Sequence, residues 1–172
     1  MILDLREFDE FPAETSLLAD PGEISPFGDS VIGVEKVECD LAIQKSSEEF
    51  FCQGRVRAEL TLECARCLTH FRSRVEGETD FIATSEATVQ ERKNVIDDED
   101  YVFFKGDDLR VDVTEPVRHT LGVELPLKPL CSDECKGLCQ QCGANLNKKT
   151  CNCRSEDADP RWEGLKKLLP DQ

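Results

Sequence analysis

Long apolar runs are missing from this chain of 172 residues. No apolar stretch approaches the roughly 18 residues that a membrane-spanning helix needs. The first ten residues are acidic and lack the apolar segment of a secretory signal peptide. Because both signals are missing, we expect a cytoplasmic protein that makes no contact with a membrane.

Basic residues are also scarce. The chain has 21 Lys and Arg residues against 36 Asp and Glu residues, a net charge of −15. Residues 1–127 hold 13 basic and 29 acidic residues, which gives −16, and residues 128–172 hold 8 and 7, which gives +1. A body of such negative charge repels nucleic-acid phosphates and attracts basic proteins.

Catalytic arrangements are absent as well. The sequence shows no nucleophile paired with a base, no phosphate-binding loop and no pair of catalytic carboxylates. We therefore expect a protein that is not an enzyme and that has no small-molecule substrate. Its length fits one domain with a small appended module.

Cysteine, by contrast, is abundant, and its spacing is the strongest signal in the chain. Two tetrahedral zinc sites need eight thiolates, and close pairs of cysteines in tight turns aim two sulfurs at one point. The sequence therefore predicts two Zn²⁺ sites, although four thiolates also hold iron. Disulfides are disfavoured because the cytoplasm keeps thiols reduced. Eight of the ten cysteines form the four pairs Cys64/Cys67, Cys131/Cys135, Cys139/Cys142 and Cys151/Cys153.

Three ways exist to join these four pairs into two sites. Joining Cys139/Cys142 to Cys151/Cys153 encloses only residues 143–150, so loop closure is entropically cheap. This pairing, which we prefer, leaves Cys64/Cys67 for Cys131/Cys135. Four protein ligands close each site, so we expect structural rather than catalytic zinc. We also expect Cys139→Ser to unfold the C-terminal module alone.

The body of the chain has the alternating pattern of β-strands. Strands are predicted at 31–44, 54–64 and 71–81, with Cys39 and Cys52 as small core residues rather than metal ligands. Cross-strand charge pairing favours a hairpin that places Glu63 opposite Arg72 and Arg57 opposite Glu78. The C-x-x-C of Cys64 and Cys67 then lies at the hairpin tip. Redox dithiols instead occupy a helix N-terminus, so we do not expect redox chemistry.

The remaining elements are shorter. Residues 1–30 are predicted to contain one strand at 2–5 and then irregular turns, and residues 83–100 an exposed loop. Residues 101–104 and 109–113 are predicted to form a second hairpin. A helix begins with Asp112 as N-cap and Glu115 completing a capping box, and a terminal helix begins at Pro160.

These elements predict an α+β fold. We expect an antiparallel β-sheet domain with one or two helices and a small C-terminal cysteine-rich zinc module. The acidic body with its hairpin tip covers residues 1–127. The zinc module and terminal helix cover residues 128–172.

With these motifs in view, the chain resembles the YceD family of bacteria and plant organelles, in its zinc-binding type with a C-terminal cysteine module. The resemblance rests on residues 62–68, on residues 131–147, on the segment from Cys151 to Trp162 and on the helix opening at 112–117. It implies a role in accumulation of the 23S RNA of the large ribosomal subunit, and hence in ribosome assembly. The family is also described as a candidate nucleic-acid binder.

Two mechanisms agree with this resemblance. In the first, the acidic body holds a basic large-subunit ribosomal protein and delivers it to the growing subunit. In the second, the nearly neutral cysteine module touches precursor ribosomal RNA. An unrelated alternative is a structural or transcription-adaptor zinc module that binds polymerase or DNA and has no link to ribosomes. For the second mechanism, the candidate RNA-binding residues are Lys136, Lys148, Lys149, Arg154, Lys166 and Lys167.

Overall fold

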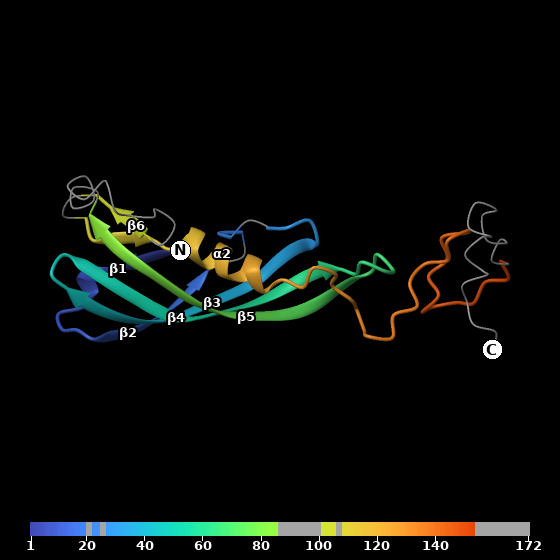
Figure 1. Ribbon diagram of the computed structural model, residues 1–172, viewed down its shortest axis with the longest axis horizontal. Coiled ribbons are helices and arrows are strands. Elements are labelled where there is room, and N and C mark those ends of the chain that lie inside the picture. Colours follow the sequence, from blue (N-terminus) through green and yellow to red (C-terminus); the bar gives the residue numbers. More distant parts are fainter. Residues whose placement is uncertain (20–21, 25–26, 86–100, 106–107, 154–172) are drawn as a thin grey trace, which may run out of the picture.

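The computed structural model describes residues 1–19, 22–24, 27–85, 101–105 and 108–153. A five-stranded sheet in the order β2-β3-β4-β5-β6 forms the body (Figure 1). Its strands are β2 (Ala13–Ala19), β3 (Val31–Ser46), β4 (Glu49–Glu63), β5 (His70–Ser85) and β6 (Tyr101–Phe104).

A smaller second layer completes the body. Strands β1 (Ile2–Asp4) and β7 (Arg110–Asp112) form a two-stranded sheet, with the short 3-10 helix η1 (Leu5–Glu7) after β1. Helix α2 (Thr114–Glu124) packs against β4 and β5. Sheet, helix and a cysteine-rich C-terminal segment confirm the predicted α+β class. In the described part of the chain, α2 is the longest helix, and none there has the length and hydropathy of a membrane span.

Alternation along the strands builds the core between these layers. On β4, Val56, Ala58, Leu60 and Leu62 are at most 2% exposed, and the residues between them are half-buried or exposed. Burial of this apolar face stabilises the packing of the two layers by about 25 cal/mol for each Å² of apolar surface removed from water. The core includes Cys39 and Cys52, both 0% exposed, which confirms that they are core residues. The opposite face of the sheet carries the charged side chains.

The predicted pairing register of the β4–β5 hairpin was wrong by two residues. Glu63 lies opposite His70, and Arg57 lies opposite Glu76. Each side chain keeps its predicted face, because a shift by an even number preserves the alternation. The loop sets the register: Cys64 N donates to Thr69 O at 3.0 Å and Leu68 N donates to Cys64 O at 2.9 Å, which closes a shorter turn than charge pairing had suggested.

Two other predictions about the strands were also wrong. Residues 101–104 and 109–113 do not form a hairpin, because β6 pairs in parallel with β5 and β7 pairs with β1. Residues 13–19, expected to be irregular, form the edge strand β2 along β3. The sequence of β2 is polar enough to hide this strand, since only Ala19 in it is fully buried.

Helix α2 begins later than predicted. Asp112 stays in β7, opposite Ile2, so Val113 takes the N-cap position. The Asp112 carboxylate still accepts a hydrogen bond from Thr114 N at 3.0 Å, which satisfies one free amide of the first turn. Glu115 does not complete a capping box and instead binds Arg118 at 2.8 Å.

Several expectations lie outside the described residues. These are the terminal helix from Pro160, most of the predicted loop at 83–100, and three candidate RNA-binding residues, Arg154, Lys166 and Lys167. The proposed boundary between residues 127 and 128 stays a prediction.

Candidate metal centres

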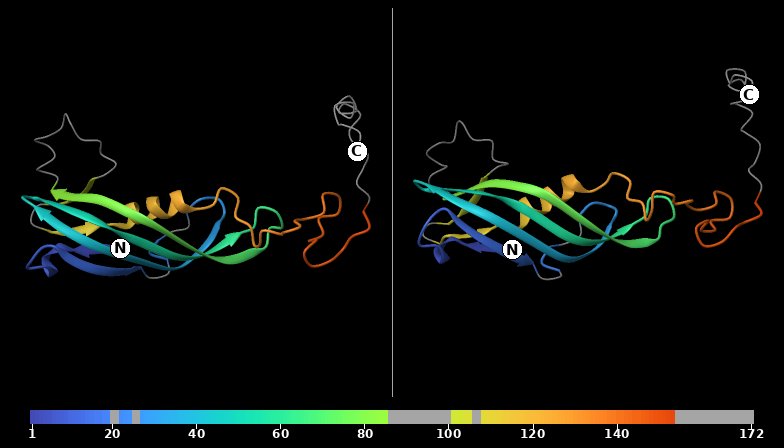
Figure 2. Two further views of the ribbon diagram at one scale, coloured as in Figure 1. Left: turned by 60° about the horizontal axis from the view of Figure 1, so that its bottom comes forward. Right: turned by 90° about the horizontal axis from the view of Figure 1, so that it is seen from below.

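The hairpin-tip tetrad consists of Cys64, Cys67, Cys131 and Cys135. The first pair sits on the short β4–β5 loop, where Leu68 turns the chain with φ 54°. The segment after α2 returns to this loop, and Ala65 N donates to Pro129 O at 2.8 Å. This contact delivers the second pair to the first, so residues far apart in sequence meet at one end of the body (Figure 2).

The spacing of the sulfurs fits a tetrahedral metal site. All four lie within 4.8 Å of one another, with Cys64 Sγ at 3.7 Å from Cys135 Sγ and Cys67 Sγ at 3.6 Å from Cys131 Sγ. A Zn–S bond of about 2.3 Å places tetrahedral sulfurs about 3.8 Å apart. A disulfide would bring two sulfurs to about 2.0 Å. The tetrad is therefore four free thiols, spaced for one ion.

Local hydrogen bonds favour a thiolate in this tetrad. Burial acts to raise the pKa of Cys64, but hydrogen bonds from the backbone amides of Cys131, Arg66 and Cys67 lower that pKa to about 6. A hydrogen bond with the Thr69 side chain is the main cause of the lowered pKa of Cys67. Metal ligation requires deprotonated sulfur, so these hydrogen bonds favour the ionised form of the thiols that a metal ion binds.

The C-terminal tetrad consists of Cys139, Cys142, Cys151 and Cys153, whose sulfurs also lie within 4.8 Å of one another. A tight turn brings Cys139 and Cys142 together. In this turn Gly143 adopts φ 69°, and Gly143 N donates to Cys139 O at 2.9 Å. Backbone amides of Cys142 and Gln141 lower the pKa of Cys139 to about 6. These cysteines are half-buried or exposed, whereas three of the hairpin-tip cysteines are buried.

In the structure, the four cysteine pairs combine into the two tetrads that the preferred pairing predicted. Each tetrad offers four sulfurs, a donor set that suits Zn²⁺ and leaves no position for water. Ligation by these residues, and zinc as the ion, remain predictions. His70 belongs to neither tetrad and lies 3.5 Å from the Glu63 carboxylate.

Comparison with known proteins supplies the family. The family model described as "Large ribosomal RNA subunit accumulation protein YceD" matches residues 52–169, which is most of the chain. The chain belongs to the YceD family. Its matched region runs from β4 through both cysteine tetrads.

Individual relatives agree with this assignment. An uncharacterised protein of Mycobacterium tuberculosis is 35% identical over 134 residues, covering 77% of this chain and 62% of the relative. An uncharacterised protein of Mycobacterium leprae is 31% identical, covering 77% and 59%. An Arabidopsis thaliana protein named "Large ribosomal RNA subunit accumulation protein YCED homolog 1, chloroplastic" is 36% identical over 73 residues, covering 42% and 23%. The chain thus spans about three fifths of the mycobacterial relatives. No solved structure matches.

The polar residues around the tetrads were not predicted from the sequence of this YceD protein. Asn147 Nδ2 donates to Cys135 Sγ at 3.2 Å, and Asn145 Nδ2 donates to Thr69 Oγ1 at 3.2 Å. Arg66 Nη1 donates to Cys135 O at 3.0 Å. The close pair of asparagines after Gly143 is the signal that was available, because Asn is common in turns that place polar side chains against nearby backbone.

Three candidate RNA-binding residues lie in the described part of this module. Lys136, Lys148 and Lys149 are all exposed. The segment 131–153 that contains them extends beyond the hairpin tip, away from the sheet (Figure 1). The structure therefore leaves them accessible, and contact with RNA stays a prediction.

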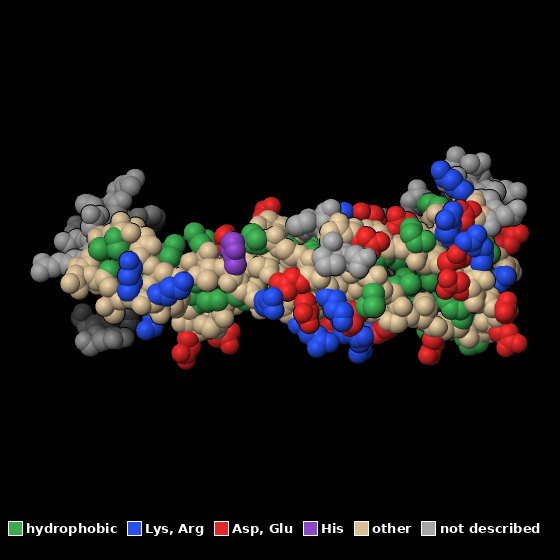
Figure 3. All heavy atoms as spheres, turned by 180° about the vertical axis from the view of Figure 1, so that it is seen from behind, with side chains coloured by type: hydrophobic (Ala, Val, Ile, Leu, Met, Phe, Trp, Pro, Cys, Tyr) green, Lys and Arg blue, Asp and Glu red, His purple; other side chains and the backbone are tan. Residues whose placement is uncertain are grey.

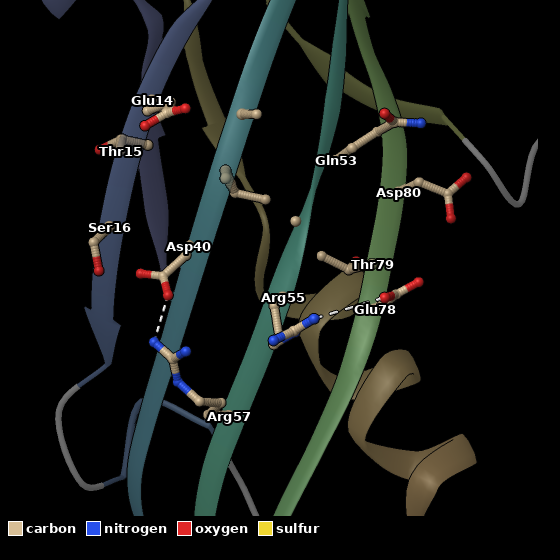
Figure 4. Close-up of a pocket in the computed structure, with 13 residues that line it drawn as sticks. Glu14, Thr15, Ser16, Asp40, Gln53, Arg55, Arg57, Glu78, Thr79 and Asp80 are labelled. Atoms are coloured by element: carbon tan, nitrogen blue, oxygen red, sulfur yellow. Dashed lines mark hydrogen bonds and ion pairs between the residues drawn. The ribbon is translucent and has the colours of Figure 1, made fainter.

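The exposed face of the sheet has a shallow hollow of about 1010 Å³. It crosses β2 to β5, and its charged lining consists of two arginines and four carboxylates (Figure 4). Arg57 pairs with Asp40, and Arg55 lies 3.8 Å from Glu78. Figure 3 shows the same mixture of basic and acidic side chains along the body. Each arginine of this hollow therefore already has a carboxylate partner.

Proposed function

We propose that this protein is a non-enzymatic, cytoplasmic factor in assembly of the large ribosomal subunit, and that its acidic body binds a basic ribosomal protein. Two structural Zn²⁺ ions complete the fold in this proposal. Family membership supports the ribosomal role, since the family is described by accumulation of large-subunit ribosomal RNA. The negative charge of the body is the reason for proposing a basic protein as the partner.

The arginines of the body support a protein partner over RNA. Affinity for RNA comes mainly from Lys and Arg that meet phosphates. Beyond the hollow, Arg72 lies 3.3 Å from Glu35 and Arg118 lies 2.8 Å from Glu115. Carboxylates hold these guanidinium groups, and residues 1–127 still carry a net charge of −16 from 13 basic and 29 acidic residues. Such a surface attracts cationic proteins.

A groove between α2 and strands β5 and β6 is the best candidate contact face. It has a volume of about 810 Å³, and its described lining includes no Lys or Arg. The rings of Tyr101 and Phe103 stack there, 6.4 Å apart. Aromatic faces and carboxylates together favour Lys and Arg side chains of a partner. The carboxylates of the groove are those of Glu78, Asp80, Asp112, Glu115 and Glu124, of which Glu78 and Glu115 already have Arg55 and Arg118 as partners.

Contact of the cysteine module with precursor ribosomal RNA is the second candidate. The exposure of Lys136, Lys148 and Lys149 favours it. Replacing all three by Gln should strongly weaken RNA association if this candidate is correct. Unchanged association would count against it.

Purification of the tagged protein from cells, with and without ribonuclease, separates the two candidates. Large-subunit proteins that remain bound after digestion would support the acidic body as the contact. Ribosomal particles lost on digestion would mean that RNA holds the complex. Glu124→Lys should weaken the retained protein contact, and Glu10→Lys, the same charge change at an exposed site outside the groove, should not.

A further inference from the structure

The two cysteine tetrads share one asparagine. Asn147 lies in the loop 143–150 that the C-terminal tetrad encloses, yet its Nδ2 donates to Cys135 Sγ of the hairpin-tip tetrad at 3.2 Å. The amide orientation follows from its other end, because Asn147 Oδ1 accepts from Lys136 N at 2.8 Å. A backbone amide needs an acceptor, so the donor end of the side chain faces the sulfur.

The enclosed loop holds Asn147 in place. Asn147 N donates to Asn145 Oδ1 at 2.9 Å, and Leu146 N donates to Gly137 O at 2.9 Å. Cys139 N donates to Ala144 O at 2.8 Å, which ties the start of this loop to a ligand of the C-terminal tetrad. These contacts connect Asn147 to the segment that carries Cys139.

A second contact runs in the same direction. Asn145 Nδ2 donates to Thr69 Oγ1 at 3.2 Å, and the Thr69 side chain hydrogen-bonds Cys67. Gly137 makes room for the approach, since its φ is 74° and an added Cβ would lie 3.1 Å from Arg66 O. The loop 143–150 thus contacts Cys135 directly and Cys67 through Thr69, which is one cysteine from each pair of the hairpin-tip tetrad.

A donor at Cys135 matters because of charge and burial. Four thiolates around one divalent cation carry a net charge of −2, and an N–H donor offsets charge on sulfur. Cys135 is 3% exposed, so water cannot readily replace a lost donor. Groups that hydrogen-bond to metal ligands are typically worth ten- to a hundred-fold in metal affinity.

We propose that Asn147 is a positioning residue that couples the two metal sites: closure of the C-terminal tetrad around its ion holds Asn147 against Cys135 and strengthens metal binding at the hairpin tip. This inference rests on the zinc sites of the proposed function. By linkage, the hairpin-tip ion strengthens binding at the C-terminal tetrad by the same factor. With this coupling, Cys139→Ser unfolds the C-terminal module and also weakens metal binding at the hairpin tip, although the pairing of cysteines is unchanged.

Four full-length proteins test the coupling: wild type, Asn147→Asp, Cys139→Ser and the double variant. Zinc content and affinity are measured by competition with a chromophoric chelator, and backbone NMR signals of residues 64–69 and 139–144 report each site. Asn147→Asp keeps the acceptor for Lys136 N but removes the donor to Cys135. Signals of β3 to β5 show whether each body stays folded.

We expect Asn147→Asp to bind two zinc ions, with the hairpin-tip affinity reduced about ten- to a hundred-fold. Cys139→Ser should bind one ion, with a similar loss at the hairpin tip. The double variant should be little weaker than Cys139→Ser, because Asn147 is no longer held there. Gln44→Glu makes the same amide-to-carboxylate change at an exposed position on β3, away from both tetrads, and should leave the hairpin-tip affinity unchanged.

Two results would overturn the coupling: an unchanged hairpin-tip affinity in Asn147→Asp, or losses that multiply fully in the double variant. A wild-type chain that binds no zinc would overturn both the coupling and the metal sites of the proposed function. Loss of ribosomal partners with intact coupling would affect the proposed function alone.

Discussion

At the scale of single residues, Gly54 has the least room for a side chain among the glycines that the structure describes. The backbones of β3 and β4 approach so closely that an ideal Cβ there would lie 1.8 Å from Asp40 O. No flexible side chain is available to move aside, so the strands themselves must shift. Gly33, on the neighbouring strand, has its nearest such atom at 3.9 Å.

We therefore expect Gly54→Ala to lower the free energy of unfolding by about 3 kcal/mol, in the upper range for overpacked sites. Gly33→Ala, the matched control, should change it by less than about 1 kcal/mol. Urea denaturation of both variants measures the difference. Equal effects at the two glycines would show that the close approach to Asp40 does not restrict residue 54.

The thiols of the metal-free chain give a pH-dependent prediction. The pKa of Cys64 in the folded chain is about 6, below its ordinary value of 9.0. Because ionisation is easier in the folded form, the Cys64 thiolate stabilises that form fully above about pH 9. This contribution falls as the pH drops from 9 towards 6 and is lost below about 6.

Denaturation of the zinc-free protein across this pH range should show that loss, and Cys64→Ser should remove much of the pH dependence. Cys39 supplies an internal control, since burial raises its pKa to about 12. Cys39 should therefore resist alkylation at pH 7, whereas Cys139, with a pKa of about 6, should react quickly. Equal alkylation rates in mass spectrometry would contradict these assignments.

At the scale of elements, the β4–β5 hairpin shows how a local turn outweighs charge pairing. Glu59 lies opposite Arg74, a favourable pair, whereas the predicted register placed Glu59 opposite Glu76. Both registers offer several opposite-charge pairs, so surface charge alone does not distinguish them. The hydrogen bonds that close the loop between Cys64 and Thr69 do.

The observed register predicts a charge-swap result. Arg74→Glu should destabilise the hairpin by about 0.5 kcal/mol, because two carboxylates then face each other. Adding Glu59→Arg should restore most of that loss. A double-mutant cycle in urea measures the coupling, and coupling of residue 59 to Glu76 instead of to residue 74 would contradict the register.

At the scale of the whole molecule, we expect the body and the two cysteine tetrads to depend on different forces. The large apolar core of the sheet, helix and short strands is separate from the small buried cluster of Cys64, Cys67 and Cys135. Apolar burial supports the first without metal, whereas the second has few apolar contacts and depends on ligation. Removal of metal should therefore make one end of the molecule open more often, while its closed form stays populated and the rest of the body stays protected.

Hydrogen exchange with and without a zinc chelator checks this expectation. Amides of residues 131–153 and of the loop 64–69 should lose protection, while those in the centres of β3 and β4 should keep it. Complete unfolding on chelation would mean that the body does not form without its metal centres. Retained protection throughout would mean that the tetrads contribute no stability.

The alternation of apolar residues was sufficient to predict β3, β4, β5 and their buried faces, because the side-chain period of a strand is local. The four close cysteine pairs and their preferred grouping were also accessible, since closing residues 143–150 into one loop is cheap in entropy. The spacing of the cysteine pairs in the sequence was therefore enough to predict which residues form each tetrad.

Long-range contacts account for the rest. The polar edge strand β2 forms because β3 offers it a partner along its length, and β6 joins β5 in parallel through pairing that no local pattern encodes. The contact of Asn147 with Cys135 belongs to the same class. These features depend on contacts between segments that are distant in sequence. The hydrophobic periodicity of a single segment does not determine the energies of such contacts.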